Sequence, residues 1–178
     1  MADIAKAAAT TVENKAKRSE WYTFLNIGGS SENWVREGKF ASEMTAQMNP
    51  QTTTAQDVTQ DTAETDITGY QPSIAVSKSV SKSDPAFEFI NEIRVHRKIL
   101  SDAYADILMV DVFNGNNGGS YPAIKQPVSV QIDSFGGPAS DPLTIAYTYN
   151  YRGDAVRGTA AIGKDGKVTF TAAASSEG

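Results

Sequence analysis

The sequence predicts a mainly β fold, in which two packed antiparallel sheets form a β-sandwich or partly closed barrel with one flanking α-helix and a long polar loop. Apolar and polar residues alternate with period two in three segments, Tyr70–Ser81, Val128–Asp133 and Leu143–Tyr151. Half-buried strands require this alternation. Only the segment that follows Asp84 has apolar residues at helical spacing, and Asn49–Thr65 has no periodicity.

At 178 residues the chain is expected to form one domain, which we place at residues 20–174. Residues 1–19 are rich in Ala, Lys and Thr and are predicted to be an arm or a weak helix, whereas residues 175–178 are expected to fray. The absence of cysteine excludes disulfides, thiolate nucleophiles and the common cysteine-based zinc sites. No stretch approaches the ~20 apolar residues that a membrane-spanning helix needs, so no membrane partner is predicted.

In the first half of the domain, aromatic and β-prone residues at Glu20–Ile27 predict a strand that ends at a Gly-Gly pair. A second strand is expected over Phe40–Met48. The polar stretch Asn49–Thr65 is predicted to be a projecting loop or a flattened hairpin, because aperiodic stretches of this length in compact domains are usually functional or disordered. The strand Asp66–Val80 follows.

The predicted helix extends over about residues 85–98. Asp84 can cap its first turn, and Pro85 suits the first helical position. Acidic residues lie early and basic residues late, as the helix dipole favours. Three apolar residues at helical spacing are predicted to pack against the sheet, namely Phe89, Ile90 and Ile93.

The second half of the domain contains further strands. Tyr104–Phe113 is apolar on both faces, which predicts a strand covered on both sides. An Asp-Gly turn predicts a hairpin between Ala155–Gly163 and Val168–Ala173. Closure by two residues would pair Ala161 with Phe170.

The non-apolar faces of the predicted strands are small, polar and nearly free of Lys and Arg. Solvent-facing strands usually carry long charged side chains, partly to protect sheet edges. A smooth, weakly acidic face indicates a surface past which something slides, and two-sided strands of this kind suggest that partner subunits cover part of the sheet. The residues expected on such a polar face include Ser129, Gln131, Asp133, Thr144, Thr148 and Asn150.

The net charge of −5 is unevenly distributed. Between Phe40 and Val76 there are acidic residues and no Lys or Arg, whereas basic residues gather at Lys15–Arg18 and Arg94–Lys98. Acidic loops of this kind also serve solubility. Binding to the grooves or the phosphate backbone of nucleic acid is disfavoured by this charge distribution, because such binding needs clustered cations.

No catalytic constellation is present in the sequence. The single histidine, His96, has no partners in a triad pattern and is interpreted as a surface or interface residue. Phosphate-binding loops, calcium loops and dinucleotide fingerprints are not matched. The run Tyr147, Tyr149 and Tyr151 could be a stacking platform for bases or sugars, but alternate strand positions of this kind favour the core. We predict a protein that is not an enzyme and that has no cofactor and no metal.

The sequence resembles the major tail tube proteins of long-tailed bacteriophages, particularly siphophages of Gram-positive hosts. The resemblance covers about Trp21 to Ala173 and rests on strand ends and turns. These motifs are WYTFLNIGG at Trp21–Gly29, Met48–Gln51, Thr65–Tyr70, Asp84–Ile90, Val110–Phe113 and Ile132–Gly137.

The resemblance implies two packed sheets flanked by a helix, similar to the inner tube protein of type VI secretion. Such proteins form hexameric rings that stack into a hollow conduit for DNA ejection. We expect at least one of two polar faces to line its lumen, namely Ser129, Gln131 and Asp133 or Thr144, Thr148 and Asn150. The implied partners are further copies of the chain, the tape measure protein inside the tube, the tail terminator, the distal tail protein and double-stranded DNA in transient, non-specific passage. The implied location is the virion tail, after assembly in the host cytoplasm.

In this family a long loop between early strands bridges to the neighbouring ring, and Asn49–Thr65 occupies that place here. The residues expected to make this contact are Asn49, Gln56, Asp57, Asp61, Glu64 and Asp66. Two alternatives stay open. One is another virion or tailocin β-protein, such as a contractile-tail inner tube, a baseplate or a head component. The other is a carbohydrate-binding β-sandwich that uses Tyr147, Tyr149 and Tyr151.

Overall fold

The computed structural model describes residues 15–59, 61–115 and 119–174. These residues form eleven strands and one α-helix, so the predicted mainly β fold with antiparallel sheets and a single flanking helix is confirmed. The elements are β1 (Trp21–Asn26), β2 (Trp34–Arg36), β3 (Ala41–Gln47), β4 (Pro50–Ala55), β5 (Glu64–Tyr70), β6 (Ser73–Ser79), α2 (Pro85–His96), β7 (Tyr104–Asp111), β8 (Ser120–Gly136), β9 (Thr144–Tyr151), β10 (Val156–Ile162) and β11 (Val168–Ala172), with short 3-10 turns at Arg18–Glu20, Leu100–Ala103 and Val112–Asn114.

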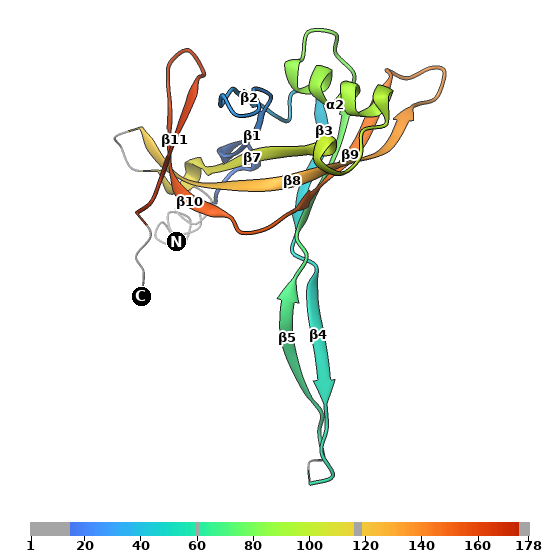
Figure 1. The fold of residues 1–178 in the computed structure, drawn as a ribbon, viewed down its shortest axis with the longest axis vertical. Coiled ribbons are helices and arrows are strands. Elements are labelled where there is room, and N and C mark those ends of the chain that lie inside the picture. Colours follow the sequence, from blue (N-terminus) through green and yellow to red (C-terminus); the bar gives the residue numbers. More distant parts are fainter. Residues whose placement is uncertain (1–14, 60, 116–118, 175–178) are drawn as a thin grey trace, which may run out of the picture.

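Nine strands form one antiparallel sheet in the order β2-β1-β7-β8-β9-β6-β3, with β10 paired to β8 and β11 paired to β10. The other two strands, β4 and β5, pair only with each other. Figure 1 shows α2 lying over one face of the large sheet and the β4–β5 hairpin projecting away from the other. The sheet is not closed into a barrel.

The long strand β8 divides the sheet into two parts. One edge of β8 pairs with β7, while the other pairs with β10 over Ser120–Lys125 and with β9 over Val128–Gly136. Buried Gln126 fills the fork, because its amide donates hydrogen bonds to the carbonyls of Pro127 (2.9 Å) and Arg152 (3.0 Å). The alternating pattern predicted only Val128–Asp133, since this glutamine and the adjoining proline interrupt it.

Two apolar cores lie on opposite faces of the sheet. The main core fills the space between the sheet and α2, and a second, smaller core lies under the β10–β11 hairpin and β2. Strand β7 contributes Ile107 and Met109 to the first core and Leu108 and Val110 to the second. The prediction that this strand is covered on both sides is therefore confirmed.

The helix begins and packs as its sequence predicts. The side chain of Asp84 accepts a hydrogen bond from the Ala86 amide at 3.2 Å, and Pro85 takes the first helical position. Arg97 adopts a left-handed conformation (φ 48°), which ends the helix at His96. Ile90 and Ile93 are buried against the sheet, Phe89 packs partly buried at the edge of the same core, and buried Phe87 is a contact that the spacing argument missed.

The aperiodic stretch after β3 is an ordered two-stranded hairpin, which we call the arm (residues 49–71). Its base is closed by hydrogen bonds from the Gln71 amide to the Asn49 carbonyl (3.2 Å) and from the Asn49 side chain to the Gln71 carbonyl (3.0 Å). The single strand predicted over Asp66–Val80 is divided at Pro72, so that its first half belongs to the arm (β5) and its second half to the large sheet (β6).

The register of the last hairpin differs from the prediction. Ala161 pairs with Thr169, and Phe170 pairs with Ala160. The chain turns through three residues instead of two, because Gly166 adopts a left-handed conformation (φ 79°) and the Gly163 amide bonds to the Lys167 carbonyl at 2.8 Å. A turn followed by a left-handed glycine is the usual form of a three-residue hairpin loop.

The packing of α2 leads to a first prediction. Replacing fully buried Ile90 by alanine removes side-chain volume from the main core, so Ile90→Ala should lower the free energy of unfolding by about 2–5 kcal/mol. The matched control is Val95→Ala, since Val95 lies on the same helix and is 54% exposed. Urea denaturation of the monomer measures both values, and equal losses would contradict the packing described here.

Candidate functional site

One face of the sheet carries a continuous layer of small polar side chains, which we call the open face. It lies on β3, β6, β8 and β9 and points away from α2, whose side of the same strands holds the main core. Direct pairing across the strands brings its members together, for example Gln131 opposite Thr148 and Thr148 opposite Ala75. Its residues are Glu43, Thr45, Gln47, Ser73, Ala75, Ser77, Ser79, Ser129, Gln131, Asp133, Thr144, Ala146, Thr148 and Asn150.

The side chains of the open face hydrogen-bond to one another. Asp133 accepts from the Gln131 amide and from the Thr148 hydroxyl, each at 2.7 Å. The Asn150 amide donates to the Gln131 side-chain carbonyl at 3.2 Å. All six residues predicted for a lumen lie on this face, including Thr144, whose hydroxyl donates to the Gly136 carbonyl at 2.8 Å. Gln131, Asp133, Thr148 and Asn150 therefore form one hydrogen-bonded network on this face.

The open face carries no cation. Its charged members are the acids Glu43 and Asp133, and none of its residues, all of which lie within the described part, is Lys or Arg. The four strands contain two lysines. Lys78 points to the opposite side and is buried, whereas Lys125 lies on the part of β8 that pairs with β7 and β10, outside the open face, and pairs with Glu32 at 2.7 Å and Asp106 at 3.6 Å. The members of the face thus offer a polyanion no group for ion pairing, and the nearest cations border the face where Ser129, Gln131 and Asn150 share a cavity with basic residues.

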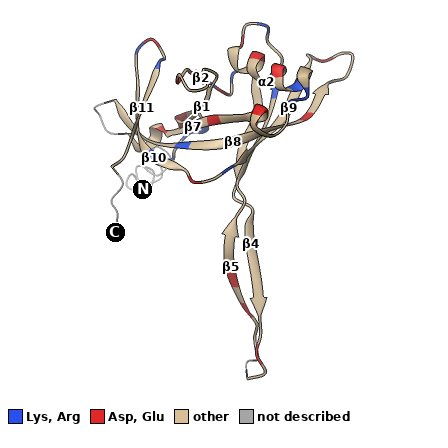
Figure 2. Cartoon of the chain, viewed as in Figure 1, with Lys and Arg blue, Asp and Glu red and all other residues tan. Residues whose placement is uncertain are grey.

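The arm holds the residues that the sequence suggested for a contact between rings. Asn49 lies at its base, whereas Gln56, Asp57 and Asp61 lie near its tip and Glu64 and Asp66 lie on β5. Figure 2 shows acidic residues and no basic ones along the arm. Every residue of β4 is exposed, and Val58 at the tip and Ile67 on β5 are exposed apolar side chains. The arm is an acidic projection that buries almost nothing within its own chain.

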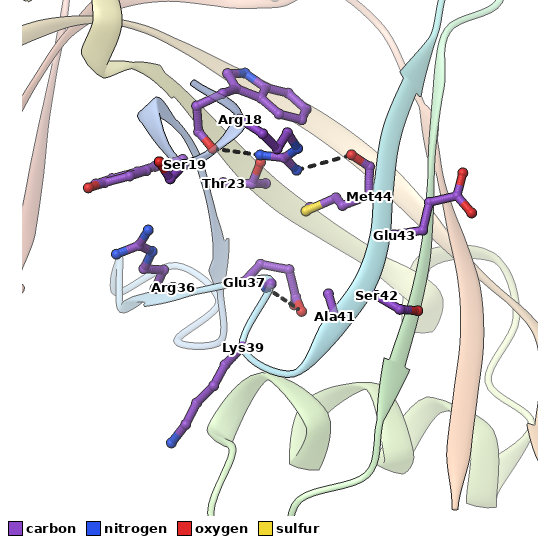
Figure 3. A pocket seen from close by; sticks show the side chains of 13 residues that line it. Arg18, Ser19, Thr23, Arg36, Glu37, Lys39, Ala41, Ser42, Glu43 and Met44 are labelled. Atoms are coloured by element: carbon purple, nitrogen blue, oxygen red, sulfur yellow. Dashed lines mark hydrogen bonds between the residues drawn. The ribbon is translucent and has the colours of Figure 1, made fainter. Parts of the chain in front are cut away.

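The two edges of the large sheet approach each other without pairing. Between β1–β2 and β3 lies an open cavity of about 690 Å³, lined by Arg18, Arg36, Lys39 and the backbone of β3 (Figure 3). Arg18 bridges it, because its guanidinium donates to the carbonyls of Trp21 and Met44, each at 3.0 Å. The outer edge of β3 is otherwise left without a strand partner.

A second basic region lies at the C-terminal end of α2, over the predicted patch Arg94–Lys98. A cavity of about 670 Å³ there is lined by Arg94, Arg97, Lys98 and Arg152. Beside them, Ile99 and Leu100 are 70% and 73% exposed. The surface is therefore both basic and apolar. It lies at the C-terminal end of α2, and its cavity is also lined by Ser129, Gln131 and Asn150 of the open face.

A buried ionic cluster joins the elements around the main core. Lys78 Nζ lies 2.7 Å from Glu37 Oε1 and 3.0 Å from Asp84 Oδ2. The hydroxyls of Tyr147 and Tyr149 donate to the two oxygens of Glu37 at 2.9 and 3.1 Å. Sequence reasoning missed this cluster, although one signal was available, since Lys78 occupies a core-facing position of an alternating strand.

The same contacts explain the tyrosine run. Tyr147 and Tyr149 are fully buried, so they cannot form a stacking platform for bases or sugars. The interpretation that these tyrosines belong to the core is confirmed. Burial, together with the negative charge of Glu37, raises the pKa values of Tyr147 and Tyr149 well above their ordinary value. Burial also raises the pKa of Tyr151 to about 12.

The remaining predicted features lie on the surface or outside the described residues. The side chain of His96 is 59% exposed and lies 3.2 Å from Glu92 one helical turn away, as expected for a surface histidine. Among the described residues, no group of His, Cys, Asp and Glu could hold a metal ion. No helix within the described ranges is long and apolar enough to cross a membrane. The N-terminal extension or weak helix predicted for residues 1–19 lies largely outside the described residues. The fraying predicted for residues 175–178 also lies outside them.

Comparisons with known proteins show where this fold recurs. No family model matches the sequence, and no curated protein is similar to it in sequence. A chain from the tail of an empty GTA particle with C6 symmetry is similar in structure, with a TM-score of 0.59, 12% identity and coverage of 89% of this chain and 100% of that one.

Two further solved structures have TM-scores of 0.50. One is a chain of the anti-feeding prophage tube-terminating cap, with 15% identity and coverage of 89% of this chain and 92% of that one. The other is a chain of the PVC sheath/tube terminator, with 11% identity and coverage of 80% and 96%. At these identities the comparisons show the fold, which is that of structural proteins from phage-like tails and contractile injection systems.

The buried tyrosines predict a pH dependence of stability. A phenol whose pKa is raised by folding stabilises the protein below its ordinary pKa near 10, and this stabilisation is lost as the pH rises further. The free energy of unfolding should fall above pH 10, with a slope of up to about 1.4 kcal/mol per pH unit for each buried tyrosine. Tyr147→Phe/Tyr149→Phe should flatten this slope, whereas exposed Tyr70→Phe should not. Urea denaturation between pH 8 and 11 measures the difference, and identical slopes in both variants would contradict it.

Proposed function

We propose that this protein is a structural subunit of a phage-type tail tube, which assembles as stacked hexameric rings into a hollow conduit for DNA ejection. The open face is the observation that carries the proposal. It is a wide sheet surface of small, mutually bonded polar side chains with two acids and no cation, set opposite a fully packed core. Such a surface suits the wall of a channel for a polyanion.

The chemistry of the open face explains how DNA would pass. A wall with Lys or Arg would bind phosphates and release counterions, and several such contacts per ring would hold the duplex. Asp133 and Glu43 repel phosphate, while the amide and hydroxyl groups stay hydrated and are occupied by each other. The duplex would then move past a water layer, with no strong contact to break at each step.

Assembly into rings would use the unpaired sheet edges. The outer edge of β3 presents backbone donors and acceptors beside the cavity that Arg18 bridges. An unpaired edge is a template for a strand of another chain. Head-to-tail contacts of this type close into a ring when their rotation divides a full turn, and the sheets of neighbouring subunits would then line one bore.

Stacking of rings would use the arm. The acidic arm continues β3 and β6 beyond the large sheet and away from α2, so the basic surface around Arg94–Lys98 lies far from its tip in the same chain. One subunit can therefore offer its arm to the basic residues of a second copy, at Arg94–Lys98 or Lys15–Arg18. Contacts of this kind do not close, and they propagate a filament.

The finer parts of the proposal follow from the family that the sequence resembles. They are a siphophage tail of a Gram-positive host, assembly in the host cytoplasm, and contacts with a tape measure protein, a tail terminator and a distal tail protein. The second candidate is a contractile-tail component, because the structures at TM-scores of 0.50 include terminator and cap proteins of contractile systems. Negative-stain microscopy of purified particles separates the two, since only a contractile tail has a sheath around its tube.

A charge added to the open face tests the proposed lumen. Thr148→Lys places a cation beside Asp133 in every subunit, so assembled tubes should retain short double-stranded DNA several-fold better than wild type. This retention should fall steeply with salt, because each phosphate contact releases about 0.9 counterion. The matched control is Thr169→Lys, because Thr169 is an exposed residue of β11 that lies outside the open face. Co-sedimentation of DNA with tubes is the measurement, and equal retention by the two variants would reject the proposed lumen.

Removal of the arm tests its role in stacking. Replacing residues 50–70 by an Asn-Gly turn keeps the bonded base at Asn49 and Gln71, so the domain should remain folded by circular dichroism. The variant should form no tubes in negative-stain micrographs. A second variant, Asp61→Asn/Glu64→Gln/Asp66→Asn, keeps the arm and removes charge, and it should polymerise more weakly than wild type. Tubes of normal length from the armless chain would show that stacking does not need the arm.

A further inference from the structure

The buried cluster holds three reactive groups in contact and away from water. Lys78 of β6, Glu37 after β2 and Asp84 at the start of α2 have side-chain exposures of 0%, 0% and 4%. The amine nitrogen lies 3.0 Å from Asp84 Oδ2 and 2.7 Å from Glu37 Oε1. The nucleophile, the carboxyl group and a proton acceptor are therefore already assembled by the fold.

We propose that Lys78 and Asp84 condense into an intramolecular amide, an isopeptide bond, with Glu37 as the proton-transfer residue. Two observations favour this reaction over a permanent ion pair. Buried charges are costly, and an amide replaces two of them by a neutral group, while the Glu37 carboxylate keeps the hydrogen bonds from Tyr147 and Tyr149. The reacting groups are also held together by the fold, and such positioning can raise an effective concentration by many orders of magnitude.

The step balances without any reagent from outside. Glu37 accepts one proton from the Lys78 ammonium, and the neutral amine attacks Asp84 Cγ to form the new C–N bond. Glu37 returns that proton to Asp84 Oδ2, and a second proton follows from the nitrogen to the same oxygen. The C–Oδ2 bond then breaks, and water leaves with both protons. No oxidation or reduction takes place.

The surroundings of the two carboxyl groups suit their roles. Asp84 Oδ1 accepts the Ala86 amide at 3.2 Å in the first turn of α2, where the amide and the helix dipole stabilise the charge that develops on this oxygen. Oδ1 then remains as the amide oxygen and keeps its bond to the helix. The hydroxyls of Tyr147 and Tyr149 hold Glu37 in place.

Pro85, the residue after Asp84, excludes one competing reaction of the Asp84 carboxyl group. Asp84 precedes Pro85, which has no backbone N–H, so the carboxyl group cannot lose water by cyclising onto the next backbone nitrogen. A loss of water at Asp84 therefore identifies a bond to another side chain. In the folded chain, the amine within contact distance of that carboxyl group is Lys78.

Mass spectrometry of the wild-type protein tests the proposal. The denatured chain should weigh one water molecule less than its sequence. Trypsin should leave residues 40–82 joined to residues 83–94, because the amide blocks cleavage at Lys78 while cleavage after Lys82 still occurs. A full sequence mass for protein that has been kept folded, or a loss of water in any other peptide, would overturn the proposal.

Variants test the proposed roles. Glu37→Gln keeps a side chain of similar size but cannot take the proton, so it should keep the full mass. Lys78→Arg and Asp84→Ala should do the same. Glu43→Gln, a change in an exposed carboxylate on the open face, should still lose one water. Glu37→Gln protein that loses water as completely as wild type would remove Glu37 from the reaction.

Discussion

The buried contact among Lys78, Glu37 and Asp84 is the constraint on which the rest of the structure depends. It joins β6, the segment after β2 and the start of α2, and the hydroxyls of Tyr147 and Tyr149 extend it to β9. Removing one partner of a buried pair leaves an unpaired charge, which costs about 3–5 kcal/mol. The cluster therefore holds these elements in a single relative arrangement, and it determines which face of the sheet the helix covers.

This choice of face leaves the opposite side of β3, β6, β8 and β9 without a covering element among the described residues. A soluble monomer would normally place long charged side chains there. The chain instead has Ser, Thr, Asn and Gln, which bond to one another and which project little. In the proposed tube, these small uncharged side chains would leave a wider bore with few charged groups on its wall. The composition of this face is therefore consistent with the proposed conduit.

Local patterns predicted local structure well. The alternation at Leu143–Tyr151 predicted β9, and Asp84 with Pro85 predicted the first turn of α2. The open face was also predicted, because alternate residues of a strand share a side. The buried cluster was not, since its members lie 41 and 6 residues apart along the chain and only the tertiary fold brings them into contact. Strand order, the fork at Gln126 and the turn of the last hairpin likewise depend on distant pairing or on one backbone angle.

The arm gains little stability from burial within its own chain. A two-stranded hairpin alone is at best marginally stable in water, and β4 buries none of its residues. Threonine-rich strands with cross-strand contacts such as Thr54 to Thr65 (3.1 Å) favour an extended hairpin but add little stability. Exposed Val58 and Ile67 gain nothing from their position in the monomer. A second copy that covered these side chains would supply the missing burial, so in the proposed assembly the arm would be stabilised by the contact that joins one ring to the next.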